Sequence, residues 1–167
     1  SRGLGDVYKR QILKEQQKEI TQKKSELELI EHKIKNRIIQ IKDAIYSEYY
    51  QIEEKWIPRR NIAILKKNIK VGEDIEYPIV ELGRKHQLNT AIFLGKVALS
   101  IDKDNISVNK FDEFASVIII IENEDNTSVK GKYIPEGDYL TLRFKGTHKE
   151  SKEYYIKILN YMKEKNY

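Results

Sequence analysis

The sequence predicts an α+β fold in which a long N-terminal coiled-coil helix precedes a domain with an antiparallel sheet. Its clearest feature is an apolar column at strict seven-residue intervals, in a stretch without Pro or Gly. The column consists of Leu13, Ile20, Leu27, Ile34 and Ile41. After residue 52 the pattern changes to short runs rich in β-branched and aromatic residues, which favour strands. The order of these runs predicts a β-α-β-β module followed by a shorter β-α unit.

Composition limits the class of protein. A chain of 167 residues has room for one ordinary domain and an extended element. It contains no cysteine, which excludes disulfides, Cys-ligated zinc and Cys nucleophiles. The longest apolar run, residues 117–121, is too short to cross a bilayer, and no signal-peptide pattern is visible. We therefore expect a cytoplasmic protein without a membrane partner.

The N-terminal third is expected to form one helix over residues 12–52, preceded by a non-native or disordered tail at residues 1–11 that lacks the helical period. A second apolar column is weak at first and is filled later by Ile30, Ile38 and Ile45. The helix would be about 60 Å long, whereas a domain of the remaining size has a radius of gyration of about 13 Å. The apolar stripe therefore needs a partner helix, and a second copy of the chain is the simplest one. The alternative is a solitary helix folded back on its own sheet.

The elements of residues 53–167 follow from local patterns. Strands are expected at residues 55–66, 91–101, 111–122, 129–134 and 139–145. A polar loop at 68–76 leads to a short helix at 78–88, which Pro78 opens at its first position. Turns are expected at 123–128 and 135–138. Thr147 and Glu150 form a capping box for a last helix that extends to about residue 166. The buried stripe of that helix is expected to be Tyr155, Ile158, Leu159 and Met162.

The segment 134–166 resembles the GyrI-like effector-binding domain in the order of its motifs. It contains a Pro-x-Gly-x-Tyr turn and strand, then Lys-Gly-Thr, then a helix with paired aromatic residues near its start. These residues are Pro135, Gly137, Tyr139, Lys145, Gly146, Thr147, Tyr154 and Tyr155. Residues 56–65 are similar to the first strand of that family, and residues 91–100 to the second, with Gly95 at the matching place. The heptad helix resembles the dimerising helix of MerR-family transcription regulators.

This resemblance implies duplicated β-α-β-β modules that cup a ligand at their interface, with the second module incomplete and the domain at 53–167 truncated at its C-terminus. It implies the ligand-sensing and dimerisation part of a regulator that responds to a small, cationic or lipophilic molecule. In that family a winged helix-turn-helix precedes the coiled coil, so promoter DNA would be contacted only through a domain that this chain lacks. A GyrI-like small-molecule hydrolase and a protein-interaction module are the alternatives.

Aromatic side chains are the candidates for the effector site. Flat cationic ligands favour aromatic walls combined with an acid, through dispersion and cation–π attraction. The candidates on elements expected to face the cleft are Trp56, Phe93, Tyr139, Phe144 and Tyr155, with Glu113 as the negative charge. Ordinary core packing is the alternative for each aromatic residue, and a surface carboxylate is the alternative for Glu113.

No residue pattern predicts catalysis, a cofactor or a metal. The three histidines, His32, His86 and His148, lack the spacing of metal ligands and are expected to be exposed. The glycine patterns of nucleotide-binding and nucleophile-elbow motifs are absent from the sequence, and the segment from Ser100 to Asp104 is interpreted as a turn. We therefore expect a binding protein and not an enzyme.

Charge does not predict nucleic-acid binding by this chain. The formal net charge is +5, but the predicted helix is nearly neutral and so is not a basic arm. The densest cationic patch is formed by Arg59, Arg60, Lys66, Lys67 and Lys70. Because this patch lies on one predicted strand and its loop, charge that protects a sheet edge is the preferred interpretation.

Overall fold

A computed structural model describes residues 2–88, 96–121 and 131–167. The chain divides into two compact units, residues 1–43 and 44–167, and each is described by itself. The turn expected at 123–128 and the first part of the strand expected from residue 91, including Phe93 and Gly95, lie outside the described residues.

The N-terminal helix is continuous but has other limits than the periodicity predicts. Helix α1 (Arg2–Tyr46) begins within the expected tail, ends before the expected residue 52, and buries none of its residues. Its end has a local cause. The Tyr49 hydroxyl donates to the carbonyl of Ala44 at 2.5 Å, and Tyr50 adopts a left-handed backbone with φ of +66°. A left-handed residue cannot continue a right-handed helix, so the chain turns here into the first strand.

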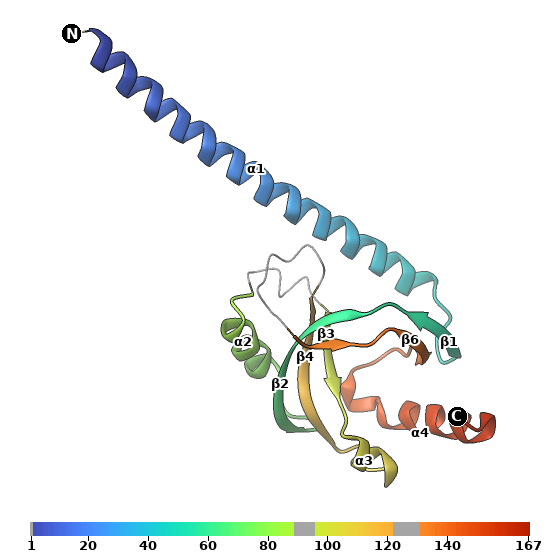
Figure 1. Cartoon of the computed structure of the whole chain (residues 1–167). Coiled ribbons are helices and arrows are strands. Elements are labelled where there is room, and N and C mark those ends of the chain that lie inside the picture. The colour runs from blue at the N-terminus through green and yellow to red at the C-terminus, as the bar shows by residue number, and fades with distance from the viewer. Residues whose placement is uncertain (1, 89–95, 122–130) are drawn as a thin grey trace. The chain divides into compact units, whose positions relative to one another are not determined.

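Two antiparallel sheets form the second unit (Figure 1). The strands are β1 (Ile52–Ile57), β2 (Arg60–Lys70), β3 (Lys96–Ser100), β4 (Glu113–Ile121), β5 (Tyr133–Ile134) and β6 (Gly137–Leu142). One sheet has the order β3-β4-β2-β5, and the other consists of β1 and β6. The α+β class and the antiparallel pairing expected from the sequence are confirmed.

The strand expected at 55–66 is in fact two strands, because Pro58 and Arg59 interrupt the ladder. Proline has no N–H to donate to a neighbouring strand. The same break recurs between β5 and β6, at Pro135 and Glu136. Residues 56–58 (Trp-Ile-Pro) and 133–135 (Tyr-Ile-Pro) carry one pattern, and β1–β2 pairs with β5–β6 in one continuous register through both breaks. An approximate two-fold axis therefore relates a first half (β1 to β4 with α2) to a second half (β5, β6 and α4).

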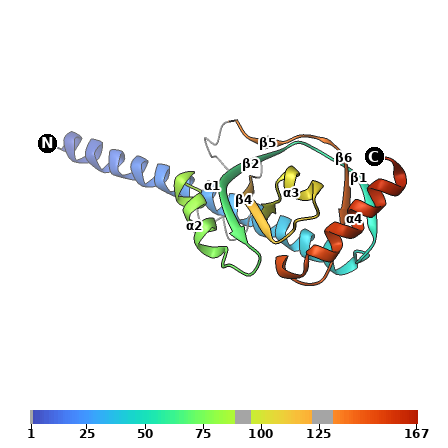
Figure 2. The ribbon, with the colours of Figure 1, turned by 90° about the horizontal axis from the view of Figure 1, so that it is seen from below.

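The helices of the second unit lie against different sheets. Helix α2 (Glu76–Lys85) packs on β2 and β4, and α4 (Lys152–Lys165) packs on β6 (Figure 2). The capping box of Thr147 and Glu150 is confirmed; it opens a 3₁₀ turn, η2 (His148–Glu150), directly before α4. Helix α3 (Lys103–Ser107) was expected to be a turn. The Asp102 side chain accepts from the backbone N–H of Asp104, and this cap lets the turn continue into a short helix.

The buried core belongs mainly to the four-stranded sheet. Ala63, Val117, Ile119 and Ile121 pack with Leu82 of α2. In contrast, α4 has no fully buried residue, and its expected stripe of Tyr155, Ile158, Leu159 and Met162 is only half-buried. None of the helices in the described ranges is long and apolar enough to cross a membrane.

Candidate ligand site

The four-stranded sheet buries apolar side chains on both of its faces. Successive residues of a strand point to opposite faces, so Ala63 faces α2 while Ile62 points away from it. Ile62 and its register partner Ile120 share that second face with Ile118, and Ile62 and Ile118 are 6% and 7% exposed. We call this the inner face of the sheet; Arg60 lies on it as well, two residues before Ile62. Because Ile62 and Ile118 are already almost fully covered, the end of this face that can meet a ligand is at the half-buried Arg60.

In the two-stranded sheet, Tyr139 is the residue that corresponds to Ile62 of the four-stranded sheet. Tyr139 and Ile62 each stand four residues after the proline of their strand, so the two-fold axis relates them. On the other face of that sheet, the Glu54 carboxylate accepts from the hydroxyls of Tyr161 at 3.1 Å and Tyr167 at 2.8 Å. Helix α4 and the segment after it therefore occupy the Glu54 face and leave Tyr139 on the opposite face.

Arg60 joins the two sheets at this point. Its guanidinium carbon lies 5.5 Å from the centre of the Tyr139 ring, a cation–π distance. Arg60 is half-buried, and its Nε atom is buried without a hydrogen-bond partner. The neighbouring Arg59 is exposed and lies 3.9 Å from the centre of the Tyr133 ring. Each of two consecutive arginines thus lies within cation–π distance of a tyrosine ring, but only Arg60 has a buried, unpaired donor among the described contacts.

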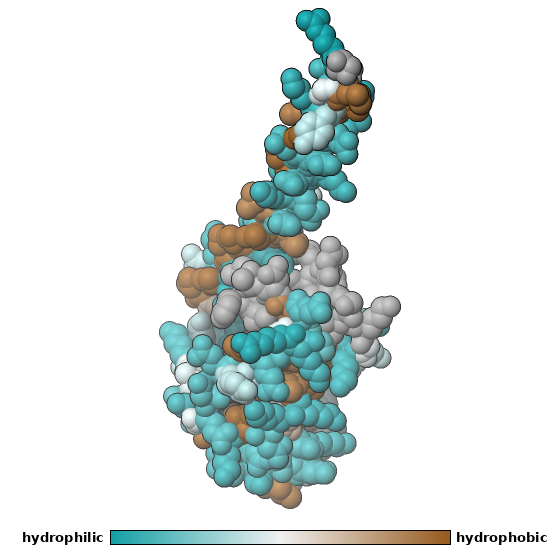
Figure 3. Space-filling view, turned by 90° about the vertical axis from the view of Figure 1, so that its left-hand side faces the viewer, coloured by the Kyte–Doolittle hydropathy of each residue, from teal (hydrophilic) through white to brown (hydrophobic). Residues whose placement is uncertain are grey.

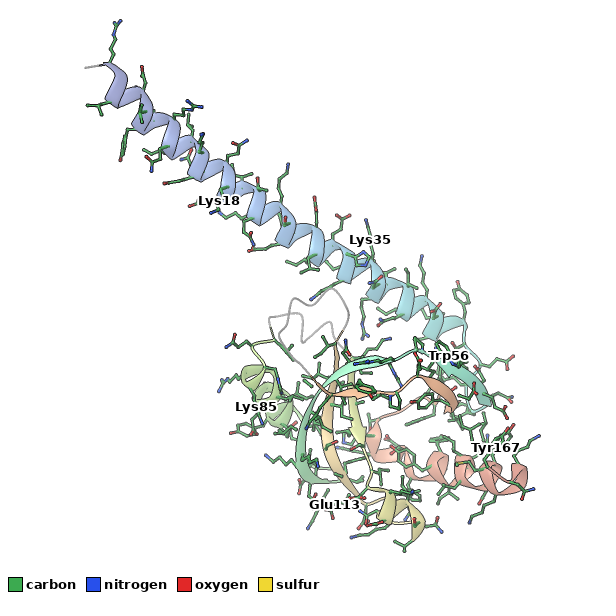
Figure 4. All side chains as sticks on the ribbon, in the orientation of Figure 1. Lys18, Lys35, Trp56, Lys85, Glu113 and Tyr167 are labelled. Carbon is green, nitrogen blue, oxygen red and sulfur yellow. The ribbon has the colours of Figure 1, made fainter. Side chains whose placement is uncertain are left out.

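The candidate residues from the sequence are not gathered in one place. Trp56 is paired with Asp138 and Tyr139 with Lys55, so these two aromatic side chains leave the sheet on opposite faces. Trp56 is 61% exposed. Trp56 and Glu113 lie at distant ends of the second unit (Figure 4). Their roles in effector binding remain predictions, and Phe93 is outside the described residues.

Two further candidates lie in separate ring contacts near α4. Tyr155 lies 5.5 Å from Phe111, between ring centres, and Phe144 stacks on Tyr154 at 4.4 Å. These distances are those of ordinary aromatic packing. Among the five described candidates, Tyr139 is the one that contacts a charged side chain across the two sheets.

Glu113 is beside cations of its own unit. Its carboxylate lies 3.9 Å from the Lys110 ammonium, and its register partner on β2 is Lys70. Basic side chains at these positions offset its charge. An effector cation would have to compete with them.

Sequence reasoning missed the environment of Arg60 and of His148. From the sequence, Arg60 is interpreted as one of the charges that protect a sheet edge. The repeated Ile-Pro pattern, which places β2 beside β5, is the sequence feature that could have indicated its position between the sheets. His148 was expected to be exposed but is half-buried, with its ring 5.8 Å from Phe114 and its Nε2 atom buried without a partner. His86 is half-buried as well, and His32 is exposed as expected.

Shifted pKa values occur at polar contacts around α4. Hydrogen bonds from Thr147 hold the pKa of Glu150 below its usual value. A hydrogen bond with Glu153 raises the pKa of Tyr154 to about 12, and hydrogen bonds to Glu54 raise those of Tyr161 and Tyr167. Each of these shifts moves titration away from neutral pH, whereas general acid–base catalysis needs a pKa near it. Within the described ranges, no three His, Asp or Glu side chains are grouped as a metal site.

The segment between α1 and β1 is bonded to the second half. The backbone N–H of Tyr50 donates to the carbonyl of Arg143 at 2.7 Å, and the Lys157 ammonium donates to the carbonyl of Tyr50. The Arg143 guanidinium donates to the hydroxyl of Ser47. The Tyr50 ring lies 5.8 Å from that of Tyr154. A left-handed Tyr50 costs backbone energy, so its surroundings must fix it, and these contacts do so.

Two related halves with paired strands, and an apolar inner face that ends at an arginine and a tyrosine, describe an α+β domain with a candidate ligand site. The sequence profile of the GyrI-like small molecule binding domain matches residues 50–167. The chain therefore belongs to the GyrI-like family. Comparisons with curated proteins and with solved structures give no significant match.

Proposed function

We propose that this chain is the ligand-sensing and dimerisation part of a MerR-type transcription regulator in the cytoplasm. Small-molecule binding follows from the family; the homodimer, and the contact with promoter DNA through a domain outside these 167 residues, are the proposal. The observation that carries it is the heptad column on α1, directly ahead of a small-molecule-binding domain. The protein would act by binding an effector, without catalysis and without a cofactor.

The apolar column of α1 supports pairing because its side chains are exposed in the single chain. Every member is at least 45% exposed, and apolar side chains recur along the helix in Figure 3. The proposed contact residues are Leu13, Ile20, Leu27, Ile30, Ile34, Ile38, Ile41 and Ile45. Burial of one Leu or Ile side chain gives roughly 1.5–3 kcal/mol before the entropy cost of association. Eight such residues from each chain would form the apolar seam of the proposed coiled coil.

Charges beside the column favour an antiparallel pair. With the column at position a, an antiparallel partner places Lys24 against Glu31 of the second copy and Glu26 against Lys33 of the second copy. A parallel partner places Glu26 against Glu31 of the second copy, and Lys23 against Lys23 of the second copy. Both of these pairs join like charges. Its one favourable pair is Glu19 with Lys24 of the second copy. Like charges at a helix interface are unfavourable. Glu26→Lys distinguishes the two, since it should weaken an antiparallel dimer and strengthen a parallel one, each by about fivefold.

The junction of α1 supports coupling between ligand and helix. Ser47 and Tyr50 are bonded to Arg143 and Lys157 of the second half, which also provides Tyr139. A ligand that changes how the two halves pack would move this anchor. Such differential contact between two states is what allosteric coupling requires.

Distances between spin labels test the dimer and its response together. The chain has no cysteine, so Lys18→Cys or Glu28→Cys gives one label per chain. An antiparallel dimer separates the Lys18 labels by about 30 Å along the helix axis and brings the Glu28 labels side by side. A parallel dimer gives short distances at both sites, with no separation along the helix axis at either one. The proposal fails if no intermolecular distance is found, or if a bound effector changes neither distance.

A further inference from the structure

Arg60 carries a buried donor without an acceptor. Its Nε atom has no hydrogen-bond partner, although nearly all buried polar groups in folded proteins have one. The guanidinium keeps its charge at every accessible pH, so it cannot avoid the cost by losing a proton. The unpaired Nε atom of this half-buried, charged side chain is therefore a position where an acceptor can bind.

The surroundings of Arg60 define the shape of that acceptor. The Tyr139 ring lies beside the guanidinium, with the ring centre 5.5 Å from the guanidinium carbon. The remaining hydrogen-bonding edge, Nε with one terminal nitrogen, matches the two oxygens of a carboxylate in a planar, bidentate contact. The neighbouring side chain on the inner face is Ile62, which is 6% exposed. A group that fits all three is a carboxylate attached to an aromatic or other flat apolar body.

Local charge agrees with an anion and not with a cation. Arg59 and Arg60 are adjacent, and the rings beside them are those of Tyr133 and Tyr139. The carboxylate expected to meet a cation, Glu113, lies instead beside Lys110. A positive site next to an apolar face raises the local concentration of anionic ligands.

We propose that Arg60, beside Tyr139, is the residue that selects the effector, and that the effector is an aromatic or flat lipophilic carboxylate. This inference rests on the proposed function only in that the domain binds a small effector. It states that the ligand of that site is an anion, whereas the sequence led us to expect a cation.

Three matched probes test this inference by calorimetric titration of the full 167-residue chain: 2-naphthoate, the neutral 2-naphthamide and the cation 2-naphthylmethylammonium. We expect 2-naphthoate to bind most tightly. Arg60→Met should weaken 2-naphthoate binding about tenfold, the value of one charged hydrogen-bonded contact, and leave 2-naphthamide within about twofold. Arg60→Lys keeps the charge but loses the planar pair of N–H donors, so its affinity for 2-naphthoate should lie between those of the wild type and Arg60→Met.

Arg59→Met is the matched control, because it removes the same chemistry from the adjacent, exposed position. It should lower the 2-naphthoate affinity by no more than about twofold, through the lost surface charge, and leave the 2-naphthamide affinity unchanged. Tighter binding of the cation than of 2-naphthoate, or undiminished 2-naphthoate binding by both Arg60 variants, would overturn the inference. If the amide and the cation bind but 2-naphthoate does not, the carboxylate selection is wrong and the binding function stands. If none of the three probes binds, the aromatic carboxylate is not the effector and the inference is overturned, whereas the spin-label distances test the proposed dimer separately.

Discussion

The two halves of the domain share one strand–proline–strand–helix pattern but differ in how they are held. In the first half, α2 lies on a four-stranded sheet and buries Pro78, Leu82 and Gly83. In the second half, β6 pairs only with β1 among the described residues, and the longer α4 buries none of its residues. Burial here follows the size of the sheet beneath the helix more closely than the apolar stripe of the helix itself.

Contacts at the surface hold the second half. Its helix is fixed by the capping box of Thr147, by the tyrosine hydroxyls on Glu54, and by the ring stack of Phe144 and Tyr154. Such contacts are individually weak compared with a buried core. The half that carries Tyr139 and anchors the end of α1 is thus the half that can adjust at lower cost, which suits a sensor.

The largest difference in stability is expected between matched leucine substitutions on the two helices, α2 and α4. Leu82→Ala should lower the free energy of unfolding by about 2–5 kcal/mol, because Leu82 is fully buried. Leu159→Ala should cost less than half as much, since its side chain keeps contact with water in the folded state. Urea unfolding followed by circular dichroism measures both. Equal losses would show that the second half has a core as complete as the first.

A smaller effect is expected at the capping box. Thr147→Ala should cost about 1 kcal/mol at neutral pH. The pKa of Glu150 is lowered chiefly by hydrogen bonds from Thr147, so the bonded carboxylate contributes stability above its ordinary pKa of 4.5. That contribution is lost as the pH falls through the lower folded value. The free energy of unfolding should be measured for wild type and Thr147→Ala from pH 7 to pH 3, and the difference between the two should become smaller as the pH falls. A difference that stays constant would show that the hydrogen bonds to Glu150 are not the source of the stability. Thr141→Ala, outside the box, is the control.

The smallest effect is expected at Glu54. Its hydrogen bonds raise the pKa of Tyr161 and Tyr167, so the protonated tyrosines stabilise the fold below their ordinary pKa of 10, and this is lost as the pH rises through the folded values. Glu54→Gln should bring both titrations back toward 10. Alkaline absorbance titration, with Tyr161→Phe to assign one step, measures the change. Unchanged titrations would mean that α4 is not attached through this carboxylate.

Local patterns predicted much of the fold because they depend only on neighbours in sequence. The heptad column, the strands around residues 62 and 118 and the Thr147 box are of this kind. The break at Pro58 was not predicted, since its form depends on the partner strand β5. The poor burial of α4 depends on how many strands lie beneath it. Arg60 could not be chosen from sequence, because Tyr139 reaches it only through the pairing of β1–β2 with β5–β6.

Sedimentation equilibrium of the 167-residue chain at micromolar concentration is the most direct test of the central claim that a second copy covers the apolar column of α1. The wild-type protein should sediment as a particle of twice the 19.8 kDa chain mass. Ile34→Asp, within the column, should convert it to the single-chain mass. Ile39→Asp is the matched control, as Ile39 is 56% exposed but lies off the column, and it should leave the dimer intact. A particle of single-chain mass for the wild-type protein would contradict the account.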